Sequence, residues 1–183
     1  MKTIFFDIDG TLAKFHDAEH NYIEAMWQEG FYKNLEPFEN IVKAANYIKN
    51  NIKDINVAVI SAYLDTEPPF VQKEKIEWLN EYLPNITDIR LVPAGTDKGT
   101  FVSEQDGEAW LVDDYNKNLN EWEQAGHHSI KFVNNINDKG MGAYGGEKGS
   151  LWQGAKVNYK TSAGNLVKKI SNLMGVDYKL TAQ

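Results

Sequence analysis

Short apolar runs recur along the chain and alternate with segments whose apolar residues are spaced as in helices. Each short run is unbroken and rich in β-branched and aromatic residues, a pattern typical of strands that are covered on both faces of a parallel sheet. This pattern predicts five strands, at residues 3–6, 55–60, 89–92, 109–112 and 130–133.

The helical segments lie between these strands and after the last one. They are predicted at residues 38–48, 67–83, 118–125 and 163–174. The last is the clearest, because Thr161 or Ser162 can cap its start and Gly175 ends it. Strands that alternate with helices favour right-handed crossovers, so we predict an α/β fold with a Rossmann-like, doubly wound parallel sheet of about five strands. In such sheets ligands bind beyond the carboxyl ends of the strands.

Two segments fall outside this alternation. Residues 13–36 insert an amphipathic, aromatic-rich piece directly after the first predicted strand, where we expect a small helical cap. Residues 138–150 are rich in glycine, which predicts a mobile loop. A length of 183 residues suits one domain, so we predict a single domain over 1–183 with a cap insertion at about 13–36.

Composition narrows the classes of partner. The net charge of -7 argues against binding along a nucleic acid polymer, although a local basic pocket could hold one phosphate. The absence of cysteine excludes disulfides and thiolate metal sites. The apolar start is too short for a signal-peptide core and no apolar run approaches membrane-spanning length, so we expect a soluble cytoplasmic protein with no membrane partner. The sequence leaves open whether the chain forms a homodimer.

The most informative residues follow the first predicted strand, in the string Asp7-Ile8-Asp9-Gly10-Thr11. An aspartate pair at the end of a buried strand can hold Mg²⁺ and leave one carboxylate to attack phosphorus. The chain begins to turn at Gly10, so both carboxylates can reach one crevice. Asp7 would then be the nucleophile and a metal ligand, and Asp9 the general acid and then base. The alternative is a turn with a capping aspartate.

Other polar residues lie at the ends of neighbouring strands or in the loop before one. Ser61 could donate a hydrogen bond to a phosphate oxygen, and Lys98 could aim its ammonium at the phosphate. The alternative for both is an ordinary turn or solvated residue. Asp113 and Asp114 repel each other unless a cation or donors compensate, which favours a metal site. Helix capping by Asp114 is the competing interpretation.

Asp-x-Asp, then Ser, then Lys, then Asp-Asp, each near the end of a successive strand, is the layout of the haloacid-dehalogenase-like phosphatase superfamily, which residues 3–133 closely resemble. The resemblance implies a phosphoaspartate at Asp7, acid and base catalysis by Asp9, and phosphate binding by Ser61 and Lys98. The Mg²⁺ ligands that it implies are Asp7, Asp9, Asp113 and Asp114.

Longer strings resemble the 5′(3′)-deoxyribonucleotidases, the cytosolic type C 5′-nucleotidases, within that superfamily. They are Glu-Gly-Phe-Tyr-Lys-Asn-Leu at 29–35 and Glu-Lys-Ile-Glu-Trp-Leu at 74–79. The resemblance implies a hydrolase for nucleoside monophosphates whose cap aromatics stack on the base. By position these are Phe15, Phe31 and Tyr32, for which the alternative is core packing of the cap.

Departures from that family limit what carries over. Tyr115 stands where family members commonly have Arg, and the cap is short, so base and sugar specificity are not transferable. The alternatives are a phosphatase for another small phosphorylated metabolite, a phospho-accepting receiver module and a catalytically silent binding protein. A receiver would carry its phospho-acceptor on a middle strand, where this chain offers Ser61.

Overall fold

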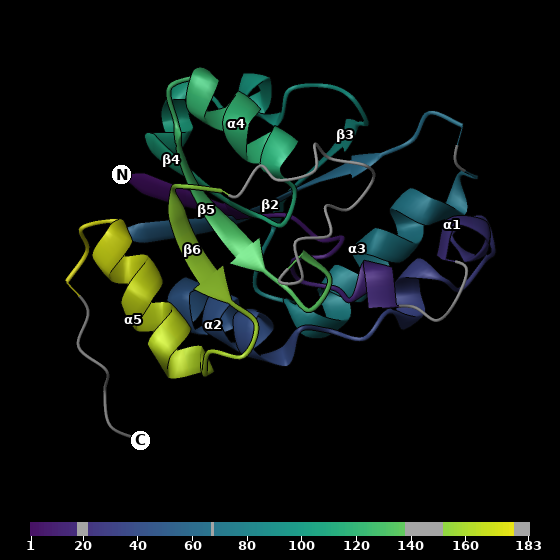
Figure 1. Ribbon diagram of the computed structural model, residues 1–183, viewed down its shortest axis with the longest axis horizontal. Coiled ribbons are helices and arrows are strands. Elements are labelled where there is room, and N and C mark those ends of the chain that lie inside the picture. The colour runs from purple at the N-terminus through teal and green to yellow at the C-terminus, as the bar shows by residue number, and fades with distance from the viewer. Residues whose placement is uncertain (18–21, 67, 138–151, 178–183) are drawn as a thin grey trace.

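A parallel six-stranded sheet, in the order β3-β2-β1-β4-β5-β6, organises the residues described by the computed structural model, which are 1–17, 22–66, 68–137 and 152–177 (Figure 1). The strands are β1 (Lys2–Phe6), β2 (Ile55–Tyr63), β3 (Asp88–Pro93), β4 (Glu108–Asp113), β5 (His128–Val133) and β6 (Ala155–Asn158). All five predicted strands are present. β6 was not predicted, because Val157 is its only buried residue and it lacks an apolar run. The predicted loop at 138–150 lies outside the described residues.

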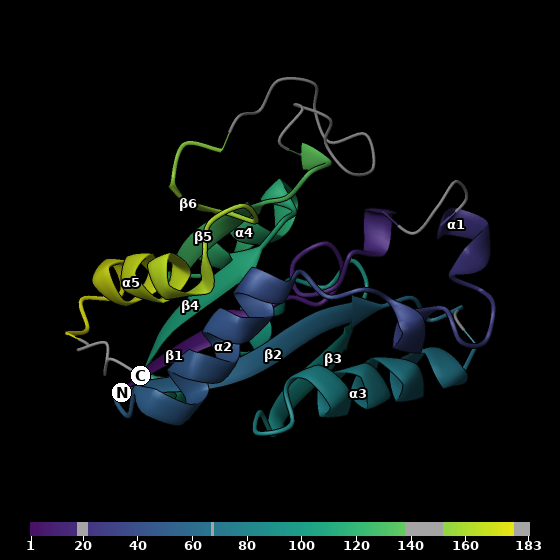
Figure 2. The same cartoon turned by 90° about the horizontal axis from the view of Figure 1, so that it is seen from below.

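The four predicted helices flank the sheet on both faces. They are α2 (Glu39–Asn51), α3 (Phe70–Tyr82), α4 (Asn116–Gln124) and α5 (Ala163–Leu173). Figure 2 shows α5, α2 and α3 across one face, and Figure 1 shows α4 on the opposite side of the sheet from α2 and α5. This arrangement confirms the predicted Rossmann-like, doubly wound α/β fold.

Each face of the sheet has its own hydrophobic core. Ile4 and Phe6 of β1 belong to the larger core, beneath α2, α3 and α5, whereas Phe5 belongs to the smaller one, beneath α4, and contacts Trp122 edge to face. Successive side chains of a strand point to opposite faces, so β1 is buried on both. Double burial explains its unbroken apolar run, and it places the end of β1 at the centre of the sheet.

The strand order reverses beside β1. The chain winds outward from β1 through β2 to β3 and then returns to the other side of β1 as β4. In an open α/β sheet the carboxyl ends of the strands at such a switch point form the ligand-binding crevice. The order also differs from the 2-1-3-4-5 order of receiver-type modules.

The segment between β1 and α2 forms short helical pieces on a paired stem. These pieces are η1 (Phe15–Asp17), α1 (Tyr22–Ala25) and η2 (Tyr32–Asn34). In the stem, the Lys14 N–H donates to the Glu36 carbonyl and the Phe38 N–H donates to the Leu12 carbonyl, both at 2.8 Å. η2 packs against α3, beyond one end of the sheet (Figure 2). We call residues 13–36 the cap.

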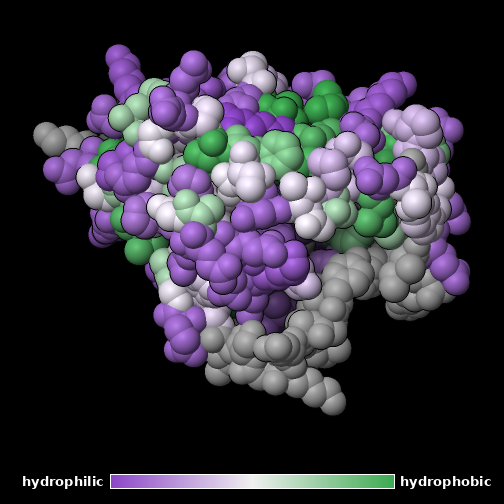
Figure 3. Space-filling view, turned by 90° about the horizontal axis from the view of Figure 1, so that it is seen from above, coloured by the Kyte–Doolittle hydropathy of each residue, from purple (hydrophilic) through white to green (hydrophobic). Residues whose placement is uncertain are grey.

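The molecular surface over α4 is largely hydrophilic, with hydrophobic side chains confined to smaller groups (Figure 3). Among the residues that the structure describes, the exposed large hydrophobic side chains come from different segments, at Met1, Trp27, Leu64 and Phe101. Within the described ranges, every helix is too short or too polar to cross a membrane. The cytoplasmic location expected from the sequence stays a prediction.

Arg90 fastens the edge strand β3 to the segment that precedes β4. Its guanidinium donates to the two carboxylate oxygens of Asp106 at 2.6 and 2.9 Å, and to Asp88 at 2.7 and 3.0 Å. Burial would raise the pKa of Asp106, but hydrogen bonds from Arg90 and Ser103 outweigh it and lower that pKa from 3.8 to about 2. Asp106 is therefore stabilised as a carboxylate in the folded chain.

Asp106→Asn should lower the free energy of unfolding at pH 7 by about 1.5–3 kcal/mol, because it removes a buried, charge-assisted hydrogen-bond acceptor. Since the pKa of Asp106 is lower in the folded chain than in the unfolded one, its contribution is complete above about pH 4 and is lost as the pH falls towards about 2. Urea unfolding of both proteins at several pH values measures this difference.

Asp88→Asn is the matched control, because Asp88 binds the same guanidinium but its side chain is 35% exposed, against 5% for Asp106. Its effect should be smaller, as is usual for exposed ion pairs. Equal losses in the two variants would contradict a specific role for Asp106.

Candidate functional site

Asp7 and Asp113 meet at the switch point of the sheet. Asp7 directly follows β1, and its N–H donates to the Val112 carbonyl of β4 at 3.0 Å. Lys98 lies between the two carboxylates and donates to Oδ1 of Asp7 and Oδ2 of Asp113, each at 2.8 Å. All three side chains are buried. The structure thus brings together three residues that the sequence predicts for the site.

The short helix η3 (Lys98–Phe101) presents Lys98 to these carboxylates. Its N-cap residue is Asp97, whose side chain accepts a hydrogen bond from the Gly99 N–H at 2.8 Å. Gly99 lies so close to α4 that an added Cβ would come within 2.7 Å of the Ala125 Cβ. The capped turn and this glycine allow η3 to pack against α4, which directs Lys98 into the buried site.

Asp114 is buried beside the turn that follows β1. Gly10 has a φ of +82°, and an added Cβ would lie 2.4 Å from Oδ2 of Asp114. Position 10 requires glycine for two reasons. Other residues rarely adopt this φ, and any Cβ would occupy the space of the Asp114 carboxylate. The glycine of the Asp-x-Asp-Gly string therefore makes room for Asp114, the acid that directly follows β4.

Three buried carboxylates form a group that could hold a metal ion. Asp7, Asp113 and Asp114 each offer a ligand atom, and these atoms all lie within 4.8 Å of one another. Burial raises the pKa of Asp7 to about 7, and repulsion from Asp113 and Asp9 adds to it while Lys98 opposes it. Burial also raises the pKa of Asp114, with repulsion from Asp113 and Asp7. A bound cation would relieve this uncompensated negative charge.

Asp113 already uses both of its oxygens in hydrogen bonds. Oδ1 accepts from the Tyr115 N–H at 2.7 Å, and Oδ2 accepts from Lys98 and from Asn118 Nδ2, the latter at 2.9 Å. The Tyr115 and Asn118 bonds fix the Asp113 carboxylate, which in turn holds the Lys98 ammonium that also donates to Asp7. Asp113 is therefore suited to holding Lys98 in place, and its negative charge would also help to balance the positive charge of a bound cation.

Asp7 and Asp114 each keep one oxygen open. Lys98 occupies Oδ1 of Asp7, and Asn134 Nδ2 occupies Oδ2 of Asp114 at 2.9 Å. Within the described part of the chain, no hydrogen-bond donor contacts Oδ2 of Asp7 or Oδ1 of Asp114. These two oxygens are the best placed to contact a metal ion or a substrate.

Asp9 stands apart from the carboxylate group and pairs with a different lysine. Its Oδ2 accepts from Lys75 Nζ at 2.6 Å, and its buried Oδ1 has no hydrogen-bond partner among the described residues. Lys75 is 1% exposed and also donates to the Ala62 carbonyl at 2.7 Å. Asp9 was also predicted as a metal ligand, but its carboxylate is not part of the group formed by the other three.

Lys75 was not predicted for the site, although the sequence holds a signal for it. It comes from α3, where Val71, Lys75 and Trp78 follow one another at helical spacing and are all buried. A lysine on the apolar face of a predicted helix must find a buried partner, because an unpaired buried charge is costly. Asp9 is that partner.

Two neighbours of Lys75 on α3 bind the cap. Glu74 is buried and accepts from the N–H groups of Gly30 at 2.5 Å and Tyr32 at 3.1 Å. Trp78 Nε1 donates to the Leu35 carbonyl at 2.8 Å. The Lys75 ammonium itself lies 4.9 Å from the centre of the Tyr32 ring. One face of α3 thus fixes the cap and Asp9 together.

Ser61 lies near the end of β2, and its buried Oγ has no hydrogen-bond partner among the described residues. The β1–β2 register pairs Phe6 with Val59, so Ser61 lies at the same edge of the sheet as Asp7. Thr11 Oγ1 is also buried and without a partner in those residues. Leaving a buried hydroxyl unbonded costs free energy, so both hydroxyls favour a bound water or ligand nearby.

The three predicted platform residues form one aromatic cluster. The Phe15 and Tyr32 rings stack at 5.8 Å, and the Phe31 ring contacts them edge to face at 5.6 and 5.1 Å. Phe15 and Tyr32 are buried, which favours the core-packing interpretation for these two. Phe31 is the member that keeps a partly exposed ring.

His16 is a second residue that was not predicted. Its Nε2 lies 3.6 Å from Oδ2 of Asp114, and its ring contacts Phe15 edge to face. It links the cap to the acidic group. A histidine at this place in the cap carries no pattern that would mark it in the sequence.

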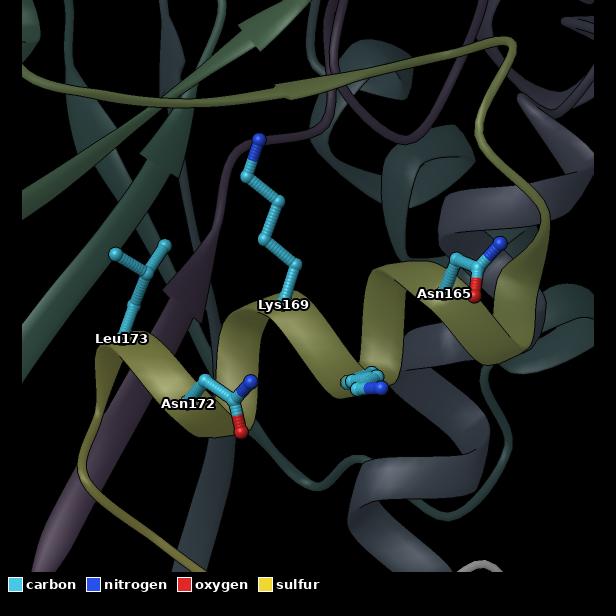
Figure 4. A pocket seen from close by; sticks show the side chains of 5 residues that line it. Asn165, Lys169, Asn172 and Leu173 are labelled. Atoms are coloured by element: carbon cyan, nitrogen blue, oxygen red, sulfur yellow. The ribbon is translucent and has the colours of Figure 1, made fainter.

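A separate surface hollow lies on α5. It is lined by Asn165, Lys168, Lys169, Asn172 and Leu173 (Figure 4). No predicted site residue lines it, so it is not the candidate site.

No protein-family model matches this chain, and a comparison with curated proteins finds no match. The superfamily resemblance that rests on the motifs therefore stays a prediction.

Gly10→Ala should cost more stability than Gly95→Ala. The two glycines have nearly the same φ, +82° and +84°, but an added Cβ at Gly95 meets no atom within 4 Å. Both substitutions therefore introduce a similar backbone strain. The contact with Asp114 should lower the free energy of unfolding of Gly10→Ala by a further amount of about 1–3 kcal/mol, as overpacking typically does. Urea unfolding of both variants measures the difference, and equal losses would show that Asp114 does not press on Gly10.

Proposed function

We propose that this protein is a Mg²⁺-dependent phosphomonoester hydrolase of the haloacid-dehalogenase type, which works through a phosphoaspartate on Asp7. The observation that supports this proposal best is the environment of the Asp7 carboxylate. Its carboxylate is buried at the switch point of the sheet, with Oδ1 held by Lys98 and Oδ2 open, beside two further buried aspartates. A nucleophile of this kind must be fixed in orientation while one oxygen stays accessible.

The first chemical step transfers the phosphoryl group to the protein. Oδ2 of Asp7 attacks phosphorus, the bond to the leaving oxygen breaks, and Asp9 donates a proton to that oxygen. Asp9 Oδ1 is suited to carry this proton, because Lys75 already occupies Oδ2. Lys98 and Ser61 would bind phosphate oxygens from the same edge of the sheet.

The second step returns the protein to its starting state. Asp9, now ionised, accepts a proton from water as the water oxygen attacks phosphorus, and the bond between phosphorus and Asp7 breaks. Asp7, Asp113 and Asp114 are the residues that would hold Mg²⁺, which would neutralise phosphate charge and lower the cost of bringing an anion to buried carboxylates. The acidic group suits a hard cation with oxygen ligands.

A nucleoside monophosphate is the substrate class that we propose. The support is the resemblance of residues 29–35 and 74–79 to nucleotidase segments, together with the partial exposure of Phe31 in the cap. Another small phosphorylated metabolite is the alternative.

Two alternatives of other classes find less support. A receiver module is disfavoured because the strand order differs from that of receivers and because the open aspartate follows β1. A silent binding protein would not need an acid with an open oxygen beside the phosphate-binding residues, and every group that the reaction requires is present.

Asp7→Asn should lower phosphate release at least about 1,000-fold, as loss of a nucleophile commonly does, while the fold is kept. Phosphate release is measured with Mg²⁺ over ribo- and deoxyribonucleoside monophosphates and common sugar phosphates. Asp54→Asn is the matched control, since Asp54 is exposed and precedes β2 at the opposite end of the sheet. It should retain full activity.

The outcomes separate the proposals. Undiminished release by Asp7→Asn would exclude the phosphoaspartate route, and no release by the wild type over the whole panel would favour a silent protein. A preference for sugar phosphates would remove the nucleotidase proposal and keep the phosphatase. A stable phosphoprotein without turnover would revive the receiver module.

Phe31→Ala should raise KM for a nucleoside monophosphate by about tenfold, the loss expected for one base–aromatic stack, with little change in kcat. KM for ribose 5-phosphate, which has no base, is the control and should not change. Phe15→Ala should instead lower stability, by about 3–5 kcal/mol, because its ring is buried. Equal KM changes for both substrates would argue against stacking on Phe31.

A further inference from the structure

Asn134 connects three loops at the carboxyl edge of the sheet. It directly follows β5 and is 1% exposed. Its Nδ2 donates to the Gly10 carbonyl at 2.8 Å, in the loop after β1, and to Oδ2 of Asp114 at 2.9 Å, in the loop after β4. One amide group therefore fixes the position of a carboxylate relative to the Asp-x-Asp-Gly turn.

The orientation of this amide is determined by its neighbours. Its Oδ1 accepts from the N–H groups of Ile136 at 3.0 Å and Asn137 at 2.9 Å. A flipped amide would place its oxygen against the Gly10 carbonyl and the Asp114 carboxylate, and its NH₂ group against two N–H donors. All four hydrogen-bonding positions of the side chain are used, so the two donors are aimed at Gly10 and Asp114.

The two acceptors that Asn134 joins would otherwise repel each other. The Asp114 carboxylate lies directly against Gly10, in space that any Cβ would fill. The Gly10 carbonyl and Oδ2 of Asp114 both carry negative charge, and donating to both offsets this repulsion. With Oδ2 held in this way, Oδ1 has no hydrogen-bond donor among the described residues, and Asp114 offers a ligand atom to the group that it forms with Asp7 and Asp113.

We propose that Asn134 is a positioning residue for a divalent cation at this site, because it orients Asp114 so that Oδ1 serves as the ligand atom. The proposal rests on the metal-binding part of the proposed function, and not on the hydrolytic reaction. Residues that orient a ligating carboxylate typically change metal affinity by about 10–100-fold when they are replaced.

The test measures metal binding directly, with the whole chain and without substrate. Mn²⁺ serves as the probe, and the fraction that stays free is followed by electron paramagnetic resonance during a titration. Asn134→Leu removes both donors and should raise the Mn²⁺ Kd by about 10–100-fold. Asn134→Ala removes the same donors without adding carbon atoms, and it serves as a second variant in case Leu does not fit. Thermal unfolding establishes that each variant is folded.

Asn137→Ala is the matched control. Asn137 binds the same loop, since its Nδ2 donates to the carbonyls of Asp114 at 3.2 Å and Phe132 at 3.0 Å, but it does not contact the Asp114 carboxylate. Its loss should lower the melting temperature and leave the Mn²⁺ Kd nearly unchanged. An unchanged Kd in the Asn134 variants, or equal weakening in the Asn134 and Asn137 variants, would overturn the proposal.

Activity separates this proposal from the proposed function. If the wild type hydrolyses phosphomonoesters, Asn134→Ala should raise the Mg²⁺ concentration needed for half-maximal rate, with kcat at saturating Mg²⁺ close to that of the wild type. If it hydrolyses none but binds Mn²⁺ with this dependence on Asn134, the inference stands and the proposed reaction falls. A wild type that binds no Mn²⁺ overturns the inference.

Discussion

The burial of three carboxylates beside the Lys98 ammonium is the constraint on which the rest of this site depends. Asp7, Asp113 and Asp114 lie at the switch point of the sheet, and Lys98 compensates only part of their charge. Like charges repel strongly where water is excluded, so every neighbour must supply a donor or leave space. Gly10 leaves the space, and Lys98 is held between two of the acids.

The two aspartates of the Asp-x-Asp string depend on different lysines. Asp7 pairs with Lys98, which comes from η3 beside α4, whereas Asp9 pairs with Lys75 from α3, on the opposite face of the sheet. The chain turns between Asp7 and Asp9, beginning at Ile8, and each carboxylate pairs with its own buried lysine. This division suits two carboxylates with different tasks, one oriented toward the acidic group and the other kept out of it.

Much of the fold and of the candidate site could be predicted, because the order of the strands and helices and the ends of the strands follow from the local pattern of apolar residues. Five of the six strands, the four helices that flank the sheet, and the edge near which Asp7, Lys98 and Asp113 lie follow from the apolar runs and from where these runs stop. β6 could not be found, because its pairing with β5 compensates for a weak pattern. Asn134 could not be found either, since its role depends on carbonyl and carboxylate groups that only the folded chain brings near it.

The buried polar face of α3 ties the cap to the acid and base chemistry that we propose. Glu74 and Trp78 bind backbone groups of the cap, and Lys75 between them binds Asp9 and lies against the ring of Tyr32. A shift of the cap would therefore disturb Tyr32, then Lys75, and through it the Asp9 carboxylate, whose buried Oδ1 has no hydrogen-bond partner among the described residues. Because Phe15 and Tyr32 are buried in this packing, Phe31 is the aromatic residue of the cap to which contact with a base would mainly fall in the function that we propose.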